Sequence, residues 1–303
     1  MSEDHRRLLI PDYEIPKALI IAHGNFTIRE TLEDIAEEAS RDIGVILFSS
    51  DPIKSRLFVA NCSFPDRFSI VAAPFDTPWV RDRAPIAVAD KAKCRWLLPR
   101  SHMEGRQLDS RLFRSISSRA MEELDLVLPQ GNLLGGPAGL AISTDRVLAD
   151  NQNLKPNDLL PFKQQLGIRD WLLIRALDSD TIGHADCYLR FLGPELMALA
   201  HAPGETVLNK TMKLLRHQLS ELFPGMDFLS LPVQMRGGML ESSLNWIQIG
   251  QLLLVPLFPR TSAQERERIE KTLAEHSFRV VFVSSPTSQY GGALHCLTAS
   301  VFF

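Results

Sequence analysis

Four short stretches of the sequence concentrate residue types that can do chemistry. They are DTPWVRDRAP at 76–85, GHAD at 183–186, SLNW at 243–246 and YGGALHC at 290–296. In an extended backbone His184 and Asp186 point to the same face, which sets an imidazole beside a carboxylate as a base and its partner require. The alternative for this pair is a strand pair on the surface, where His and Asp are common.

Cys296 is the candidate nucleophile. A free cysteine is more often a small buried hydrophobe, and the other three cysteines keep that interpretation. Gly291 and Gly292 lie just upstream of Cys296 and allow the backbone to approach a ligand closely. That access favours chemistry at this cysteine.

The stretch at 76–85 adds two acids, Asp76 and Asp82, around Trp79 and Arg81. Trp79 is as well suited to the core as to a substrate. For Arg81 we expect a structural ion pair with one of the two carboxylates.

Other chemistries lack their motifs. There is no HExxH, no paired CxxC and no His/Asp cluster with ligand spacing, so we expect no metal. GGPAGL at 135–140 has neither the Lys and Ser/Thr of a phosphate loop nor the spacing of GxGxxG, and GxSxG does not occur. The sequence therefore predicts no cofactor, and a cysteine with a histidine and carboxylates is the surviving arrangement.

Composition narrows the class of protein further. The 303 residues carry 33 Lys and Arg against 36 Asp and Glu, a net charge of −3, which predicts no nucleic-acid partner and no anionic membrane partner. Apolar stretches such as 249–258 are broken by polar residues or proline and fall short of the ~20 residues of a bilayer span. The first ten residues lack an apolar signal core and the cysteines are unpaired in spacing, so we expect a cytoplasmic protein with reduced thiols.

The organisation predicted is a single domain over 1–303, of which 1–12 form a flexible N-terminal segment. Apolar periodicity predicts helices at 28–43, 109–124, 157–166, 208–222 and 262–273. Capping boxes are expected from Thr27 to Glu30 and from Ser262 to Glu265. The strand-like runs are VILFSS, LVL, WLLIRA, FLSLPV and RVVFV.

A unit of about fifty residues recurs along the chain. Hairpins are predicted in IAVADKAKCRWLL, LAISTDRVLA, LRFLGPELMALA and NWIQIGQLLLVPL. One polar residue stands just ahead of each hairpin: Asp82, Asn132, Asp186 and Asn245. Cys296 holds the same place before the apolar tail, and successive members of this series are 50, 54, 59 and 51 residues apart. Recurrence at a fixed period is typical of radial architectures, although residue identity between the units is poor.

Taken in order, DTPWVRDRAP, GNLLGG, TIGHADCYLRF, SLNW with LLLVPLF, and YGGALHC resemble the agmatine deiminase and bacterial-type peptidylarginine deiminase family, from about Pro11 to the end. The resemblance implies the pentein fold, a five-bladed pseudosymmetric α/β propeller, and a small cationic guanidino substrate. It implies Cys296 as nucleophile, His184 as general acid and base, and Asp82 and Asp186 as carboxylates that hold the guanidinium. The expected substrate-binding residues are Asp76, Trp79, Asn132, Asn245, Gly291 and Gly292.

The implied reaction suits these residue types. A guanidinium is a poor electrophile that needs orientation, which two carboxylates can give by accepting its planar N–H groups in bidentate fashion. The arriving cation would lower the pKa of the thiol, and a thiolate is a strong nucleophile. Hydrolysis would give a ureido product and ammonia. An amidinotransferase on the same fold and a binding protein without turnover are the alternatives.

Two departures from the family pattern stand out. Many members carry an acid before the glycine pair, as in EGGN, where this chain has Pro129 and Gln130. Gln130 is expected to hydrogen-bond to His184 in place of that acid. The usual DxGP has Ala84 in place of glycine, which disfavours a positive φ there.

Two points are left open by the sequence. Arg190 and Arg236 are candidates to receive a substrate carboxylate, with surface charge as the alternative, and a homo-oligomer is possible.

Overall fold

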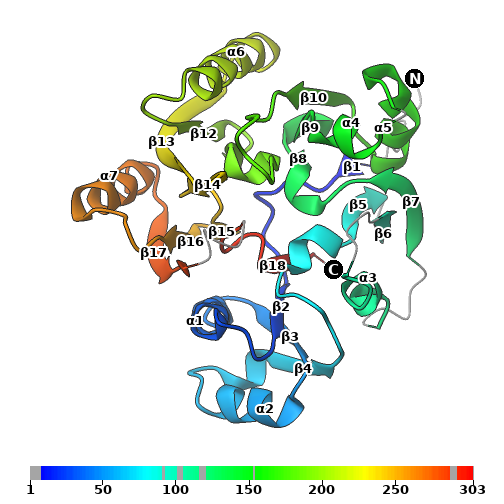
Figure 1. Cartoon of the computed structure of the whole chain (residues 1–303), viewed down its shortest axis with the longest axis vertical. Coiled ribbons are helices and arrows are strands. Elements are labelled where there is room, and N and C mark those ends of the chain that lie inside the picture. The colour runs from blue at the N-terminus through cyan, green and yellow to red at the C-terminus, as the bar shows by residue number, and fades with distance from the viewer. Residues whose placement is uncertain are drawn as a thin grey trace.

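Five small sheets surround a common centre, and the larger helices lie on the outside of the ring (Figure 1). The computed structural model describes residues 8–90, 93–100, 105–115, 121–152, 154–286 and 292–302. The predicted α/β fold class is confirmed, and the five sheets in the described part of the chain are consistent with the predicted five-bladed propeller, so each sheet is called a blade below.

Each of the five sheets has three or four strands. In spatial order, the first consists of β18 (Thr298–Val301), β2 (Ala18–His23), β3 (Gly44–Ser49) and β4 (Phe68–Ala72), and the second of β1 (Leu8–Leu9), β5 (Ile86–Asp90), β6 (Lys93–Arg100) and β7 (Glu122–Val127). The third is β10 (Asp170–Ile174), β9 (Leu140–Thr144) and β8 (Leu134–Gly135). The fourth is β11 (Leu189–Gly193), β12 (Leu196–His201), β13 (Asp227–Arg236) and β14 (Met239–Ser242), and the fifth is β15 (Ile247–Ile249), β16 (Leu252–Leu257) and β17 (Arg279–Ser284).

Every blade repeats one connection. An antiparallel pair is followed by a parallel pair, and the parallel strands are joined through helix on the outside of the ring. The helices are α1 (Arg29–Ser40), α2 (Pro52–Ala60), α3 (Asp109–Leu112), α4 (Arg146–Asp150), α5 (Leu160–Leu166), α6 (Thr206–Leu222) and α7 (Ala263–Ala274). The period of about fifty residues in the sequence corresponds to one such blade.

The ring closes by pairing the two ends of the chain. β18 pairs antiparallel with β2, with Ala299 opposite Ile20. β1 pairs antiparallel with β5, and Asp12 N–H donates to the Gly135 carbonyl at 3.0 Å. Residues 8–12 are therefore held against the second and third blades, and their assignment to a flexible segment is wrong, whereas 1–7 lie outside the described residues.

Most predicted elements are confirmed. α1, α6 and α7 bury the expected faces, and Ser262 caps α7 by accepting a hydrogen bond from Glu265 N–H at 3.1 Å. The Thr27 capping box is wrong, because α1 has Ile28 at its N-cap and no side-chain cap bond. At the end of α5, Gly167 adopts the left-handed conformation that stops a helix, with φ 66°.

Two predicted elements are wrong. The helix expected over 109–124 ends after one turn, at Leu112, and residues from Glu122 form β7 instead, because pairing with β6 overrides a helical period; 116–120 lie outside the described residues. LAISTDRVLA is not a hairpin, since β9 already pairs on both edges with β8 and β10, and the chain turns at Asp145 into α4. Helix α2 and strands β2 and β4 were not predicted from the sequence.

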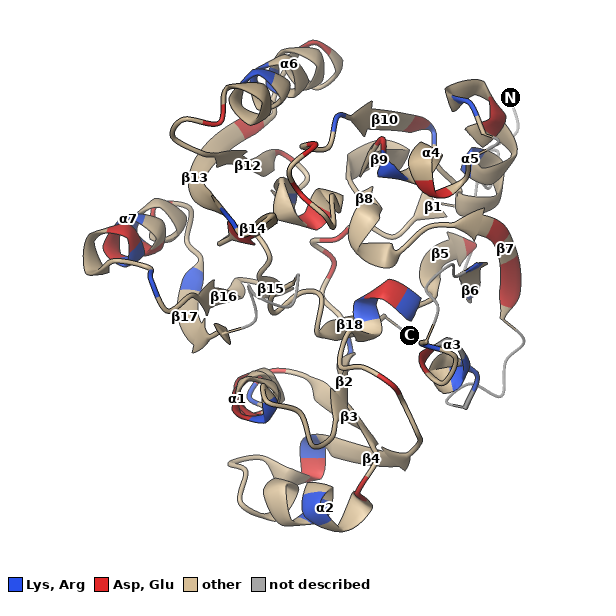
Figure 2. Ribbon diagram, viewed as in Figure 1, with Lys and Arg blue, Asp and Glu red and all other residues tan. Residues whose placement is uncertain are grey.

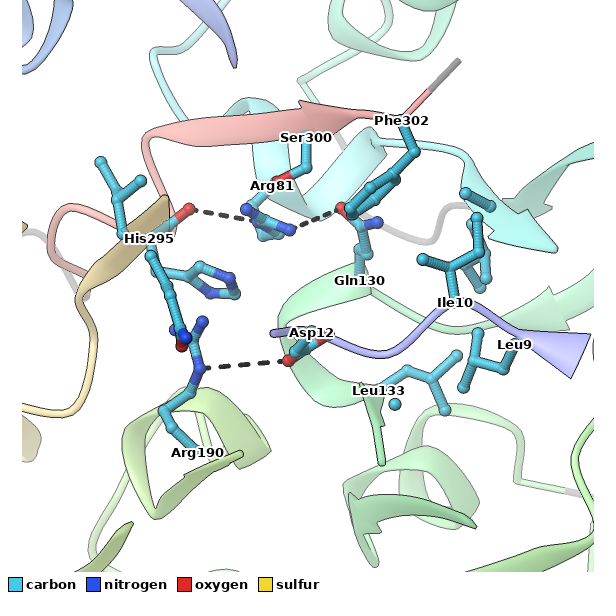
Figure 3. A pocket seen from close by; sticks show the side chains of 15 residues that line it. Leu9, Ile10, Asp12, Arg81, Gln130, Leu133, Arg190, His295, Ser300 and Phe302 are labelled. Carbon is cyan, nitrogen blue, oxygen red and sulfur yellow. Dashed lines mark hydrogen bonds and ion pairs between the residues drawn. The ribbon is translucent and has the colours of Figure 1, made fainter. Parts of the chain in front are cut away.

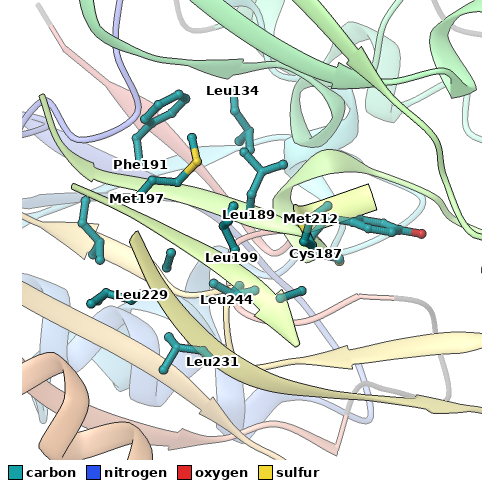
Figure 4. Packing of buried hydrophobic residues seen from close by; sticks show 14 of the residues in the cluster. Leu134, Cys187, Leu189, Phe191, Met197, Leu199, Met212, Leu229, Leu231 and Leu244 are labelled. Carbon is teal, nitrogen blue, oxygen red and sulfur yellow. The ribbon is translucent and has the colours of Figure 1, made fainter. Parts of the chain in front are cut away.

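The core consists of several clusters of buried apolar side chains between sheets and helices. The largest joins the third, fourth and fifth blades and includes Leu189, Phe191, Met197 and Leu231 (Figure 4). Charged residues of both signs are interspersed along the peripheral helices (Figure 2). None of the helices in the described ranges has the length and apolar character needed to cross a bilayer.

Leu297 tests the link between ring closure and the core. It is fully buried in the cluster formed by α1, β2, β3 and the fifth blade. We predict that Leu297→Ala lowers the free energy of unfolding by about 2–5 kcal/mol, because truncation leaves a cavity that the ring cannot fill. Leu57→Ala on α2, where the side chain is 63% exposed, is the matched control and should change stability by less than about 0.5 kcal/mol. Equal denaturant midpoints for the two variants would contradict this prediction.

Candidate active site

Five segments, one from each blade, meet at the centre of the ring. Three are 3-10 turns at Val80–Arg83, Gln130–Asn132 and Ala185–Cys187, and the other two are the turns that follow β14 and precede β18. They carry the five residues whose spacing defined the repeat: Asp82, Asn132, Asp186, Asn245 and Cys296. A short turn is rigid enough to fix a side chain and leaves its backbone groups free to contact the next blade.

Cys296 is held by two of its neighbours in this centre. Its Sγ lies 3.4 Å from Asn245 Nδ2 and 3.7 Å from Asp186 Oδ2, and its N–H donates to Asn245 Oδ1 at 3.4 Å. The residue is only 4% exposed. The thiol therefore faces a carboxylate and an amide inside the protein, as a nucleophile aimed at a bound substrate requires.

Asp186 and His184 flank the backbone of Gly131. A methyl group on Gly131 would lie 3.0 Å from Asp186 Oδ2 and 3.3 Å from His184 Nδ1. Asp186 Oδ1 and His184 Nδ1 are both buried and have no hydrogen-bond partner among the described residues. Buried polar atoms are rarely unsatisfied, so these two atoms mark a place where a polar ligand would complete the structure. The sequence signal for Gly131 was the GNLLGG stretch, but no role was predicted for this glycine from the sequence.

Asp82 completes the group from the second blade. Its Oδ1 lies 4.0 Å from His184 Nδ1, while its Oδ2 accepts a hydrogen bond from Arg106 Nη1 at 2.7 Å. Burial alone would lower the pKa of Arg106, but the carboxylates of Asp82 and Asp109 outweigh it and the pKa is raised. Arg106 was not predicted, because nothing in its local sequence indicates a partner 24 residues away.

His295 is a second residue that sequence reasoning missed. Its Nδ1 lies 2.7 Å from Asp186 Oδ2. Burial, and then the nearby charges of Arg190 and Arg81, keep the pKa of His295 well below its ordinary value. The ring is therefore neutral, and its Nδ1–H donates to the carboxylate. The signal available was its position directly before Cys296.

Trp79 and Gly292 lie beside Cys296. A methyl group on Gly292 would be 2.7 Å from the Trp79 ring and 3.1 Å from Cys296 Cβ, so only glycine lets the three residues pack this closely. Trp79 also packs against the core cluster of the first blade. Gly291, the other predicted glycine, lies outside the described residues.

Asn132 and Asp76 contact the site less directly. Asn132 Oδ1 accepts from Thr144 N–H and Oγ1 and from Ala185 N–H, at 2.9 to 3.1 Å, which ties the third blade to the turn that carries Asp186. Its Nδ2 is buried and lacks a partner in the described ranges. Asp76 Oδ2 accepts from Leu108 N–H at 2.8 Å, and Asp76 N–H donates to Asp109 Oδ1 at 2.7 Å.

Two of the expected contacts are wrong. Arg81 does not pair with Asp76 or Asp82: it donates to the His295 carbonyl at 3.2 Å and to Gln130 Oε1 at 3.0 Å (Figure 3). Gln130 is thus turned toward Arg81 and away from His184, because the buried guanidinium needs an acceptor. The backbone of Ala84, with φ −66°, is compatible with alanine.

Asp12 and Arg190 line a small cavity of about 30 Å³ together with His295. Asp12 faces Arg190 there, 4.0 Å away, and burial raises the pKa of Asp12 to about 6 against the attraction of that arginine (Figure 3). Arg190 also donates to the Trp246 carbonyl at 2.8 Å, and Arg236 pairs with Glu241 at 2.7 Å. Both arginines proposed to receive a substrate carboxylate therefore have internal partners.

The electrostatics of the centre disfavour a thiolate in the unliganded protein. Burial, and then the charges of Asp186 and Asp82, raise the pKa of Cys296 well above its ordinary value. Burial also raises the pKa of Asp186, against the attraction of His184 and Arg190. A cation bound between the acids and the sulfur would reverse these effects. Within the described ranges, no three His, Cys, Asp or Glu side chains are grouped so that they could hold a metal ion.

The family model for Porphyromonas-type peptidyl-arginine deiminase matches residues 16–301. The chain belongs to this family. Among solved structures, the agmatine deiminase of C. jejuni superposes with a TM-score of 0.85 and 18% identity, over 100% of this chain and 98% of that one. The agmatine deiminase of Enterococcus faecalis gives 0.79 and 14%, over 97% and 95%. At these identities the structural likeness shows the fold, and no curated protein is significantly similar in sequence.

The charge on Asp186 can be tested through the reactivity of Cys296. We predict that iodoacetamide alkylates Cys296 of the wild type slowly at neutral pH, with a rate that still rises past pH 9, the ordinary pKa of a thiol. Asp186→Asn removes a negative charge beside the sulfur, so the thiol pKa falls and alkylation at pH 7 becomes severalfold faster.

Peptide mass spectrometry gives the rate at each cysteine separately. Asp178→Asn, the same change at a side chain that is 84% exposed, should leave the rate at Cys296 unchanged. Alkylation that is slower in the Asp186→Asn variant would mean that the carboxylate assists thiolate formation.

Proposed function

We propose that the protein hydrolyses the guanidino group of agmatine or an arginine derivative, with Cys296 as nucleophile, to give a ureido product and ammonia. The observation that carries the proposal is the meeting of a buried thiol with two carboxylates and an imidazole at the centre of the ring: Cys296, Asp186, Asp82 and His184. Membership of a deiminase family supports it.

The substrate guanidinium binds to one oxygen of each acid. Asp186 Oδ2 is occupied by His295 and Asp82 Oδ2 by Arg106, which leaves the two Oδ1 atoms as acceptors. This differs from a bidentate fork on a single carboxylate. N–H donation to two separate carboxylates fixes the plane of the guanidinium and places its central carbon toward the sulfur.

The reaction proceeds through a covalent intermediate. The bound cation lowers the pKa of the thiol, which gives up its proton to His184, and Sγ of Cys296 attacks the central carbon. His184 delivers this proton to the departing nitrogen, the C–N bond breaks and ammonia leaves, with an amidino-thioester on Cys296. His184 then takes a proton from water, which attacks the same carbon; the C–S bond breaks, His184 returns that proton to the sulfur, and the ureido product is released.

Two alternatives use the same site. An amidinotransferase would pass the amidino group from Cys296 to an amine, which requires that water be excluded in the second step. A binding protein without turnover is favoured only by Pro129 and Gln130, which stand where many family members have an acid before the glycine pair. A thiol and an imidazole that lie near the same two acids favour an enzyme over a binding protein, since binding alone needs neither.

The substrate panel separates these functions. We predict that the purified protein releases ammonia from at least one of agmatine, arginine, methylated arginines and arginyl peptides, and that Cys296→Ala abolishes the release. Ammonia release that needs an added amine acceptor would identify a transferase. Guanidino binding with background ammonia for the whole panel would establish the binding protein instead.

Gly131 gives a test of the geometry. Gly131→Ala places a methyl group against Asp186 Oδ2, which cannot retreat because His295 holds it. We predict a loss of at least about tenfold in kcat/KM with unchanged melting temperature, because sub-ångström displacement of aligned groups is costly in rate. Gly193→Ala is the matched control, since a methyl group there meets nothing within 4 Å. Full activity of Gly131→Ala would show that Asp186 and His184 are not aligned as described.

A further inference from the structure

The guanidinium of Arg106 binds Asp82, one of the two acids that face the thiol of Cys296. Its Nη1 donates to Asp82 Oδ2 at 2.7 Å. The Arg106 side chain is 11% exposed and that of Asp82 12% exposed, so water screens the pair weakly. A cation on this carboxylate is either a competitor that the substrate must displace or a fixed support.

The other contacts of Arg106 show that it is a fixed support. Its Nε donates to Asp109 Oδ2 at 2.8 Å and its Nη2 donates to the Trp79 carbonyl at 2.9 Å. Two of the three described contacts are therefore independent of Asp82. All three arms of the planar guanidinium are used, and a lysine could not reproduce this geometry.

Asp109 is itself held in place. Its Oδ1 accepts from the N–H groups of Asp76 and Thr77 at 2.7 and 3.1 Å, and its Oδ2 accepts from Thr77 Oγ1 at 2.7 Å. Asp109 is 2% exposed. The segment that carries Arg106 is thus fastened to the segment that leads into Trp79 and Asp82, and displacement of Arg106 would take from the buried Asp109 charge the cation that is hydrogen-bonded to it.

We propose that Arg106 is a positioning residue for Asp82: by holding Oδ2 it directs Oδ1 alone toward the guanidinium of the substrate. This inference deepens the proposed function and rests on it. It explains why Asp82 Oδ1 lies near His184 Nδ1, at 4.0 Å, with the opposite edge of the carboxylate closed to ligands.

Arg106→Gln removes the positive charge and two of the three nitrogens through which Arg106 donates hydrogen bonds. We expect the KM for the best guanidino substrate to rise about tenfold or more with a smaller change in kcat, because Asp82 holds the guanidinium in ground and transition states alike. Arg106→Lys should lie between this variant and the wild type. Arg111→Gln, at an exposed position on the nearby α3, is the matched control and should match the wild type.

A double-variant cycle shows whether Arg106 acts through Asp82. Asp82→Asn with Arg106→Gln should be no worse than Asp82→Asn alone, because the support has nothing left to position. Additive losses, an unchanged KM in Arg106→Gln, or a lower KM would each overturn the inference; the last would make Arg106 a competitor for the acid. Melting temperatures close to that of the wild type show that each variant is folded.

The dissociation constant of agmatine in the Cys296→Ala background gives the same comparison without turnover. It should rise about tenfold on adding Arg106→Gln. Failure of the proposed function alone would appear as a wild type that binds agmatine but releases no ammonia, and the effect of Arg106 would still be measured. Failure of the Arg106 inference alone would appear as an active wild type whose KM and affinity ignore Arg106. A protein that neither binds nor converts any guanidino compound would overturn both.

Discussion

The hydrogen bond between His295 and Asp186 is the interaction on which the centre of the molecule depends. Asp186 is fully buried, and burying a carboxylate is costly unless a hydrogen bond compensates for the lost water. His295 satisfies Oδ2 at 2.7 Å, whereas Oδ1 has no partner among the described residues. One edge of the acid is thereby fixed and the other has no partner within the described part of the chain. The raised pKa of the neighbouring Cys296 follows from the same burial and the same charge.

The ring brings these groups together. No blade contains more than part of the site, and each contributes a short turn at the centre. Closure by β18 against β2 places Cys296 directly ahead of a strand that the N-terminal half of the chain holds in register. A deformation of any blade therefore displaces one partner of the site and leaves the others in place, which is why packing close to the centre, such as that of Leu297, bears on chemistry as well as stability.

Sequence reasoning predicted what depends on local pattern and order. The period of about fifty residues located the blades, and the HxD pair and the terminal Cys296 were found because their residue types are unusual in such segments. Side-chain partners across blades were missed or misassigned. Gln130 was expected on His184 and lies on Arg81, and Arg106 reaches Asp82 through a fold-dependent contact that no local spacing encodes. The apolar period predicted helix over the start of β7, because a period within one segment cannot register the neighbouring strand.

The most direct test of this mechanism is a crystal structure of the Cys296→Ala variant with the best guanidino compound of the panel bound. We predict that the guanidinium lies at the centre of the ring, donates to Oδ1 of Asp186 and Oδ1 of Asp82, and turns its central carbon toward residue 296, while Arg106 and His295 keep their places on the two Oδ2 atoms. A guanidinium bound away from Asp186, or with its carbon facing away from position 296, would contradict the mechanism.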